Sequence, residues 1–210
     1  MRNIFVTGAG TDVGKTVVSA ILVEALGADY WKPVQTGSAL GTDTEKIKKL
    51  IQNEKTIFHE EKYLLQNAIS PHAAAKLEEV TIEIDEIELP ETNNHIVIEG
   101  AGGILVPINR NYFIVDLIRK FDPDVFLVYT NYLGSINHTL LTIEALKQRN
   151  INIKGIVFNG QRDFFSEEII LHHGKFKSVY YVEKEKKVNQ AMIFKYAEEF
   201  KKKFIDEEYI

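Results

Sequence analysis

IFVTGAGTDVGKT, residues 4–16, is the stretch of this 210-residue chain that decides its fold. An apolar strand over Ile4–Thr7 runs into a glycine-rich loop, and the loop ends in Gly-Lys-Thr where a helix is expected to begin. In a phosphate-binding loop, backbone N–H groups and the helix N-terminus hold phosphate oxygens. Lys15 would supply a cation, and the hydroxyl of Thr16 can ligate Mg²⁺. The stretch therefore predicts a nucleoside triphosphate site after the first strand.

Two other interpretations of this loop compete with phosphate binding. A dinucleotide fingerprint needs glycines at the spacing GxGxxG; Gly8 and Gly10 fit, but the third position is Val13. The phosphate-loop spacing is also imperfect, because four residues normally separate its glycines and Ala9 stands where the first would fall. A simple glycine turn before an ordinary helix is the other alternative. The coincidence of strand, Gly-Lys-Thr and helix favours the phosphate loop over both.

Short apolar runs alternate with amphipathic stretches along the rest of the chain. The runs lack polar alternation, as expected for strands that helices cover on both faces. We expect strands at Ile4–Thr7, Ala28–Val34, His95–Glu99, Asp124–Thr130 and Lys154–Asn159. We expect helices at Lys15–Leu26, Asp43–Gln52, Asn137–Arg149 and Ala191–Phe204. The alternation predicts a three-layer α/β fold of the P-loop NTPase type with a mainly parallel sheet, and a single domain over residues 1–210.

Composition excludes several classes of function. Thirty acidic and 25 basic residues give a net charge of -5, which argues against a nucleic-acid partner. The absence of cysteine excludes disulfide scaffolds, thiolate metal sites and cysteine nucleophiles. The amino terminus lacks the apolar core of a signal peptide, and no apolar run is long enough to span a bilayer. We therefore expect a soluble cytoplasmic protein without a membrane partner.

Charged residues stand at the strand ends, where ligands of parallel α/β folds bind. Lys32 follows the second strand and could stabilise a transferring phosphoryl group, or be an ordinary solvated lysine. Asp43 could cap the helix that it opens, or ligate Mg²⁺. Glu99 ends an apolar strand where a phosphate-loop site usually has an aspartate facing the metal. The GAGG that follows Glu99 would let the backbone approach a ligand.

Two later segments have weaker signals. Gly134-Ser135 opens a helix and could bind an anion through free N–H groups, or act only as a helix cap. Asn159-Gly160 could recognise a purine edge, or form a plain turn. His172 and His173 are adjacent and favour a surface position, so the histidines suggest no metal cluster.

Taken in order, these motifs resemble the dethiobiotin synthetase family. They run from residue 6 to about residue 160, and VIEGAGG and LGSINH are much more specific than a phosphate loop alone. The matching strings are VTGAGTDVGKT, WKPVQTGS, SPH at Ser70–His72, VIEGAGG with the following LVPI, NYLGSINHTLLT, and GIVFN.

The resemblance implies a homodimeric, ATP- and Mg²⁺-dependent ligase of biotin synthesis whose small-molecule substrates are 7,8-diaminononanoate, CO₂ and ATP. One amine is carbamoylated, the carbamate takes the γ-phosphoryl group of ATP, and the second amine closes the ring and expels phosphate. The family's catalytic lysine matches Lys32, with Lys15 in support. Its metal ligands match Thr16, Asp43 and Glu99.

The resemblance also implies two further sets of residues. Nucleotide-binding positions match Asp12, Val13, Gly14, Lys15, Thr16, Val17, Asp43, Glu99, Gly100, Ala101, Gly102, Asn159 and Gly160. Substrate-binding positions match Thr11, Lys32, Thr36, Gly134, Ser135 and Asn137, the last three contributed by the partner subunit.

The chain departs from the family pattern in two places. Ala9 and Gly10 replace the Thr-Asp pair common in the family's loop, so a side-chain contact is lost there. The C-terminal strand reads VYYVEK, residues 179–184, and lacks the usual Gly-x-Ile/Leu-Pro that flanks the purine. Base selectivity is therefore open at this point.

The main alternative is an ATPase switch of the kind that places chromosomes or division sites. Such proteins have a signature lysine early in the loop, where this chain has Gly10. An amidating ligase of the cobyrinate type is a second alternative, but it needs a glutamine-hydrolysing domain whose usual cysteine is missing.

Overall fold

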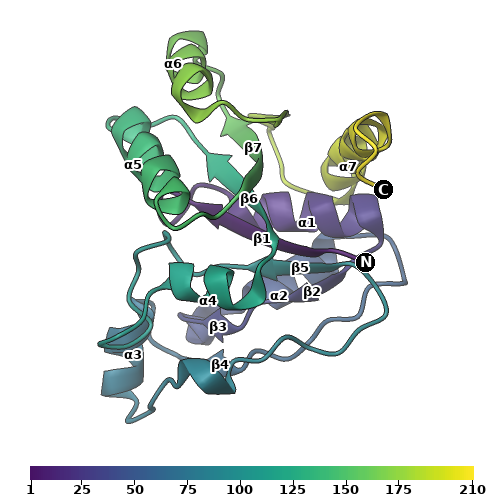
Figure 1. Cartoon of the computed structure of the whole chain (residues 1–210). Helices are drawn as coiled ribbons and strands as arrows, with labels where there is room; N and C mark the ends of the chain where they lie inside the picture. Colours follow the sequence, from purple (N-terminus) through teal and green to yellow (C-terminus); the bar gives the residue numbers. More distant parts are fainter.

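The computed structural model describes residues 1–210 and is built around a six-stranded sheet (Figure 1). Its strands are β1 (Asn3–Gly8), β2 (Asp29–Trp31), β5 (Ile96–Glu99), β6 (Asp124–Tyr129), β7 (Ile153–Gly160) and β8 (Ser178–Glu183). They lie in the order β2-β5-β1-β6-β7-β8, and every pair is parallel. Two short strands, β3 (Val34–Gln35) and β4 (Tyr63–Leu64), form a separate parallel pair. The prediction of a parallel α/β fold is confirmed.

Helices cover both faces of this sheet (Figure 1). The helices are α1 (Lys15–Leu26), α2 (Asp43–Leu50), α3 (Pro71–Leu77), α4 (Ile114–Phe121), α5 (Ser135–Lys147), α6 (Phe164–Gly174) and α7 (Gln190–Asp206). One hydrophobic cluster joins the sheet to α1, α2 and α7, and a second joins it to α3, α4, α5 and α6. Successive strand residues enter opposite clusters, as the period of two requires: Ile4 and Val6 lie in one, and Phe5 in the other. The three layers are thus confirmed.

The helix predicted over Lys15–Leu26 has those bounds in the structure, and Gly27 ends it in the left-handed conformation. The prediction of one strand over Ala28–Val34 is wrong. Pairing with β5 stops at Trp31, and Val34–Gln35 pairs instead with β4. Pro33 stands at the break, where a residue without an N–H group cannot continue the hydrogen-bonded ladder.

The sheet order explains where a ligand would bind. β1 lies between β5 and β6. The chain that leaves β1 leads to β2 on one side of it, and the chain that leaves β5 leads to β6 on the other side, so these two connections diverge at the carboxyl ends of the strands. In open parallel sheets such a reversal of strand order leaves a crevice. The phosphate loop after β1 and Glu99 at the end of β5 therefore meet there. None of the helices combines the length and apolar character needed to cross a membrane.

Candidate active site

The phosphate loop joins β1 to α1, and a side chain from a distant strand braces it. Gly14, the N-cap of α1, has φ 95°, a backbone conformation that residues with a side chain rarely adopt. A Cβ at Gly14 would lie 2.0 Å from Nδ2 of Asn159. That Nδ2 donates to the carbonyl of Val13 at 2.9 Å. Glycine is therefore required here both by the backbone and by the amide that holds the loop against β7.

Lys15 is held inside the loop that it belongs to. Its side chain is buried, and Nζ donates to the carbonyl of Gly10 at 2.7 Å. Burial lowers the pKa of Lys15 to about 8; Glu99 opposes this and Lys32 adds to it. Burial thus disfavours the charged amine by more than the nearby carboxylates favour it. A bound polyphosphate would offset this cost of burial with additional negative charge.

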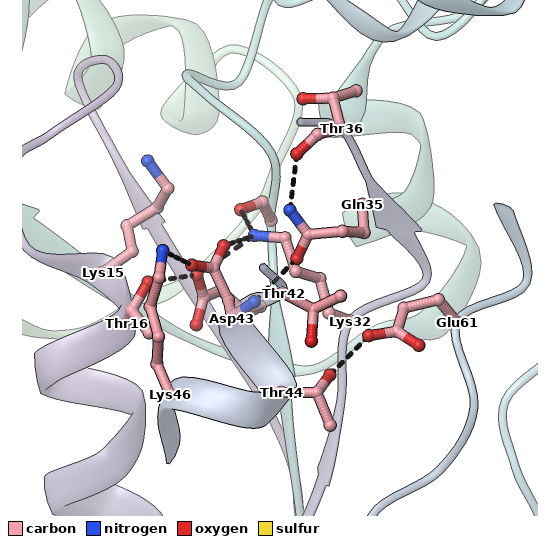
Figure 2. Close-up of polar contacts among 12 residues, drawn as sticks. Lys15, Thr16, Lys32, Gln35, Thr36, Thr42, Asp43, Thr44, Lys46 and Glu61 are labelled. Carbon is pink, nitrogen blue, oxygen red and sulfur yellow. Dashed lines mark hydrogen bonds and ion pairs between the residues drawn. The ribbon is translucent and has the colours of Figure 1, made fainter. Parts of the chain in front are cut away.

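Lys32 forms the centre of the site because two carboxylates share its amine (Figure 2). Nζ lies 2.9 Å from Oδ2 of Asp43 and 3.1 Å from Oε1 of Glu99, and the lysine is 4% exposed. Burial alone would lower the pKa of Lys32, but the charges of Glu99 and Asp43 outweigh it and raise the pKa. The amine is therefore a fixed cation, which excludes the solvated alternative.

Asp43 is the first residue of α2 and does not cap it, so the capping interpretation is wrong. The cap is Thr42, whose hydroxyl accepts from the N–H of Glu45 in a reciprocal capping box. The carboxylate of Asp43 is left for lysines: Oδ2 contacts Lys32, and Oδ1 lies 2.8 Å from Nζ of Lys46. Burial raises the pKa of Asp43, but Lys32 and then Lys46 lower it to about 2.

Glu99 is 1% exposed and receives hydrogen bonds at both oxygens. Oε1 accepts from the hydroxyl of Thr16 at 2.9 Å and from Lys32, while Oε2 accepts from the hydroxyl of Tyr30 at 3.1 Å. Burial and the charge of Glu99 raise the pKa of Tyr30 well above its ordinary value, so the phenol stays a donor. Gly100 follows with no room for a side chain, because a Cβ there would lie 2.9 Å from the ring of Phe5.

The donor set around Lys32 fits Mg²⁺. Thr16 offers a hydroxyl, and Asp43 and Glu99 offer carboxylates, which are the oxygen ligands that Mg²⁺ prefers. No three His, Asp or Glu side chains gather into a metal cage in this structure. A site of two carboxylates and a hydroxyl suits Mg²⁺ bound jointly by protein and phosphate oxygens.

These residues surround a cavity of about 830 Å³. The predicted site residues that line it are Thr11, Asp12, Gly14, Lys15, Thr16, Lys32, Thr36, Asp43, Glu99, Ala101 and Gly102. A second cavity, of about 590 Å³, lies at the opposite ends of the strands near the Arg2–Asp124 ion pair. It contains none of the predicted site residues.

The other predicted site residues lie outside the larger cavity. Val13 and Gly100 are buried, and Val17 is within α1. Asn159 and Gly160 end β7, beside the phosphate loop. Gly134, Ser135 and Asn137 begin α5, where the hydroxyl of Ser135 is 3.1 Å from that of Tyr129.

Sequence reasoning missed residues that support the site. Gln35 ties two parts together: its Nε2 donates to the carbonyl of Thr36 at 2.6 Å, and its Oε1 accepts from the N–H of Asp43 at 2.9 Å (Figure 2). Tyr30 and Lys46 contact the two carboxylates directly. Tyr30 had a signal in the sequence, because it stands two residues before Lys32 in the strand predicted over Ala28–Val34, and alternate residues of a strand share a face.

A Gly-Lys-Thr loop that opens a helix, with a buried acid at the end of the adjacent strand, defines a P-loop nucleotide-binding protein. A sequence model of the AAA-domain family matches residues 2–192. The ATP-dependent dethiobiotin synthetase BioD of Cytophaga hutchinsonii is 52% identical over 94% of this chain and 96% of its own length. That of Christiangramia forsetii is 47% identical over 98% of this chain and 99% of its own. The chain belongs to the dethiobiotin synthetase family.

Solved structures share the fold at low identity. A cell division ATPase MinD of Pyrococcus furiosus matches with a TM-score of 0.55 and 17% identity, over 96% of this chain and 99% of that one. A ParA family ATPase of Chlorobium tepidum matches with a TM-score of 0.53 and 11% identity, over 93% and 98%. At these identities the similarity establishes the fold alone.

Proposed function

We propose that this chain builds the ureido ring of dethiobiotin from 7,8-diaminononanoate, CO₂ and ATP, with release of ADP and phosphate. The observation that carries the proposal is Lys32, a buried cation 2.9 Å from Asp43 and 3.1 Å from Glu99, in the cavity that also contains the phosphate loop. The reaction brings a carbamate anion to a polyanionic triphosphate, so positioned positive charge is its main need. The name of the relatives, ATP-dependent dethiobiotin synthetase, supports the same reaction.

The chemistry proceeds in three bond-forming steps. An amine nitrogen attacks CO₂ and loses a proton, which gives a carbamate. A carbamate oxygen attacks the γ-phosphorus, and the bond to the ADP oxygen breaks. The second amine attacks the carbamoyl carbon and loses a proton, and phosphate leaves as the ring closes. Lys32 and Lys15 neutralise the anions that meet in the second step.

The phosphate loop would bind the triphosphate through the N–H groups of residues 12–17, with Ala101 and Gly102 of the facing loop across the cavity. Lys15 would exchange its contact with the carbonyl of Gly10 for a phosphate oxygen. Asn159 uses Nδ2 on Val13, which leaves Oδ1 to accept from an exocyclic purine amine. Gly160 allows the chain to turn beside the base, with φ 103°.

We propose that Thr16, Asp43 and Glu99 would hold Mg²⁺, which when bound supplies charge neutralisation to the triphosphate oxygens. The 2.9 and 3.1 Å contacts of Lys32 support this assignment, because its amine keeps the two carboxylates together. Without such a cation, the buried carboxylate of Glu99 and the half-buried carboxylate of Asp43 would repel each other.

The diamine would lie across the rest of the cavity, against Thr11, Lys32 and Thr36. Gln35 supports this end of the site because its amide joins Thr36 to the first residue of α2. The diamine would therefore lie between the element that bears Asp43 and the loop that follows Lys32.

We propose a homodimer in which the start of α5 completes the partner's substrate site. Gly134 and Asn137 are exposed there, and none of the predicted α5 residues lines the cavity of its own chain. Leu133 is fully exposed and Leu141 is 55% exposed, which supports an interface over this helix.

We also propose that the chain is a single domain, which is supported by the two hydrophobic clusters that flank one sheet. The use of ATP supports a cytoplasmic location.

The test is to incubate the protein with Mg-ATP, bicarbonate and 7,8-diaminononanoate and to look for the cyclic urea by mass spectrometry. We expect product and ADP in equal amounts, and neither above background when the diamine is omitted. ATP hydrolysis that is independent of the diamine, with no cyclic urea, would contradict the proposal. That result would instead favour an ATPase switch.

A further inference from the structure

Tyr30 is a buried phenol that the proposed reaction does not use. Its side chain is completely buried, and its ring packs in the hydrophobic cluster beneath α1 and α2, with its centroid 6.0 Å from that of Phe58. Its hydroxyl nevertheless donates to Oε2 of Glu99 at 3.1 Å. The residue therefore links the apolar core to the candidate metal site.

The strand register explains how Tyr30 reaches this carboxylate. In the parallel pair of β2 and β5, Tyr30 lies opposite Val97. Val97 and Glu99 are two residues apart, so their side chains share a face with that of Tyr30. The ring of Tyr30 extends diagonally along this face, and its hydroxyl ends under Glu99.

Tyr30 differs from the other two donors to Glu99. Thr16 and Lys32 bond to Oε1 and line the cavity, so a ligand can reach both. Tyr30 bonds to Oε2 and is not part of the cavity lining. A ligand entering the cavity can draw Thr16 and Lys32 away from Glu99, but it has no access to the packed ring of Tyr30.

We propose that Tyr30 is a positioning residue that fixes Glu99 from beneath, so that Oε1 faces Thr16 and the phosphate loop. The hydroxyl occupies Oε2, which prevents the carboxylate from rotating about its last side-chain bond. This role rests on the proposed Mg²⁺ site and extends it to a residue that touches neither cation nor nucleotide. Partners that orient a metal ligand typically contribute 10- to 100-fold to metal affinity.

The experiment is a calorimetric titration of ADP into the protein, in EDTA and over a series of Mg²⁺ concentrations, for wild type and Tyr30→Phe. The Mg²⁺ requirement is the Mg²⁺ concentration at which the Mg²⁺-dependent gain in ADP affinity is half complete. We expect Tyr30→Phe to raise this requirement by about 10-fold or more. ADP affinity in EDTA should stay at the wild-type value, because the phosphate loop is unchanged. An unchanged Mg²⁺ requirement, or an equal loss in EDTA, would overturn the proposal.

Tyr180→Phe is the matched control. Tyr180 is 2% exposed, and its hydroxyl donates to a carboxylate, Oε2 of Glu207, at the same 3.1 Å. It lies on β8, away from the cavity. Tyr180→Phe removes a similar bond and should leave the Mg²⁺ requirement at the wild-type value; a shift as large as that of Tyr30→Phe would overturn the proposal.

A double-mutant cycle tests whether Tyr30 acts through its partner. In a Glu99→Gln background, Tyr30→Phe should cause no further change in the Mg²⁺ requirement, and additive effects would contradict the proposal. If Tyr30→Phe does not fold, Glu99→Asp replaces it. The shorter side chain withdraws the carboxylate from the hydroxyl, so the Mg²⁺ requirement must rise or the proposal fails.

The titration also separates this inference from the proposed function. A wild-type protein that binds ADP in a Mg²⁺-dependent way yet forms no cyclic urea would refute the ligase reaction, and the Tyr30 comparison would still decide the positioning role. Wild-type ADP binding that ignores Mg²⁺ would refute the metal site and the role of Tyr30 together.

Discussion

Asp29 and Glu99 are two buried carboxylates at opposite ends of the same pair of strands. Asp29 begins β2 and is completely buried; Glu99 ends β5 and is 1% exposed. Burial is thus nearly equal, and by itself it would rank both as candidate functional groups. Their surroundings differ in the donors that compensate the charge and in access to a cavity.

The partners of Asp29 come from two loops and are hydrogen-bond donors that close around it. Oδ2 accepts from the hydroxyl of Thr92 at 2.5 Å, and Oδ1 accepts from the N–H of Ile57 at 3.1 Å and from Asn94 at 3.2 Å. His59 lies 3.4 Å from Oδ2. Asp29 lines neither of the two cavities described above, so its bonds only fasten the loops to the sheet.

Glu99 is compensated by a lysine that it shares with a second carboxylate, and it lines the large cavity. Its donors are Thr16 of α1, Tyr30 of β2 and Lys32, which follows β2; Thr16 and Lys32 are accessible to a ligand. A buried acid is therefore functional here because its partners can be exchanged, and structural at Asp29 because they cannot. Substitutions at the two ends should separate activity from stability.

The largest effect on activity is expected from Lys32→Ala. Loss of a preorganised cation from a transition state typically costs about 100- to 1,000-fold in rate, so ring formation should fall by that much or more. ADP affinity should stay close to wild type, because the phosphate loop and Lys15 are unchanged. Cyclic urea is measured by mass spectrometry and ADP binding by calorimetry.

Lys32→Ala also leaves Glu99 buried without its cation, which should reduce stability by about 3–5 kcal/mol in the absence of Mg²⁺. Lys46→Ala is the control. Lys46 also pairs with Asp43, the other carboxylate that contacts Lys32, but its own side chain is exposed. This substitution should cost much less stability. Equal loss of ADP binding and ring formation in Lys32→Ala would restrict Lys32 to nucleotide binding.

A smaller effect, on stability alone, is expected from Asp29→Ala. The substitution leaves buried donors from Thr92, Asn94 and Ile57 without an acceptor, which should cost about 1–3 kcal/mol of the free energy of unfolding. The folded variant should keep its rate of ring formation. Urea unfolding measures the loss, and Asp206→Ala at an exposed position is the control. A large loss of activity in folded Asp29→Ala would break the contrast between the two acids.

Local sequence patterns predicted the phosphate loop, α1, five of the six strands of the sheet, and Lys32, Asp43 and Glu99 as candidate site residues, all three of which line the cavity. The charged residues at strand ends, Lys32 and Glu99, could be predicted to converge because parallel strands end at one edge. The break after Trp31 could not, since the apolar run continues through Val34 and only the pairing with β4 reveals a second sheet. The hydrophobic pattern also missed α3, α4 and α6, and β8 was expected only from the family resemblance, as the C-terminal strand over residues 179–184.

The unpredicted parts of the site depend on tertiary contacts. Nothing in the sequence near Asn159 indicates that its amide supports Val13, which is far away along the chain. Gln35 is similar, because its bond to Asp43 depends on where α2 begins. Thr42, rather than Asp43, caps α2, and both residue types are favoured caps, so sequence alone could not choose between them.

The smallest expected effect concerns pH and again contrasts the two acids. Burial would raise the pKa of Asp29, but the bonds from Thr92, Ile57 and Asn94 outweigh it and lower the pKa. A carboxylate whose pKa is lower in the folded state than in the unfolded state stabilises the fold fully above its unfolded pKa, about 3.9. This contribution disappears as the pH falls through the folded pKa.

Asp29→Asn keeps the shape of the side chain but cannot titrate. The difference in unfolding free energy between wild type and Asp29→Asn should therefore be constant from neutral pH to about pH 5 and shrink below about pH 4. Urea unfolding at a series of pH values measures it. A difference that persists unchanged below that range would mean that the shape of the side chain, and not its charge, fastens the loops to the sheet.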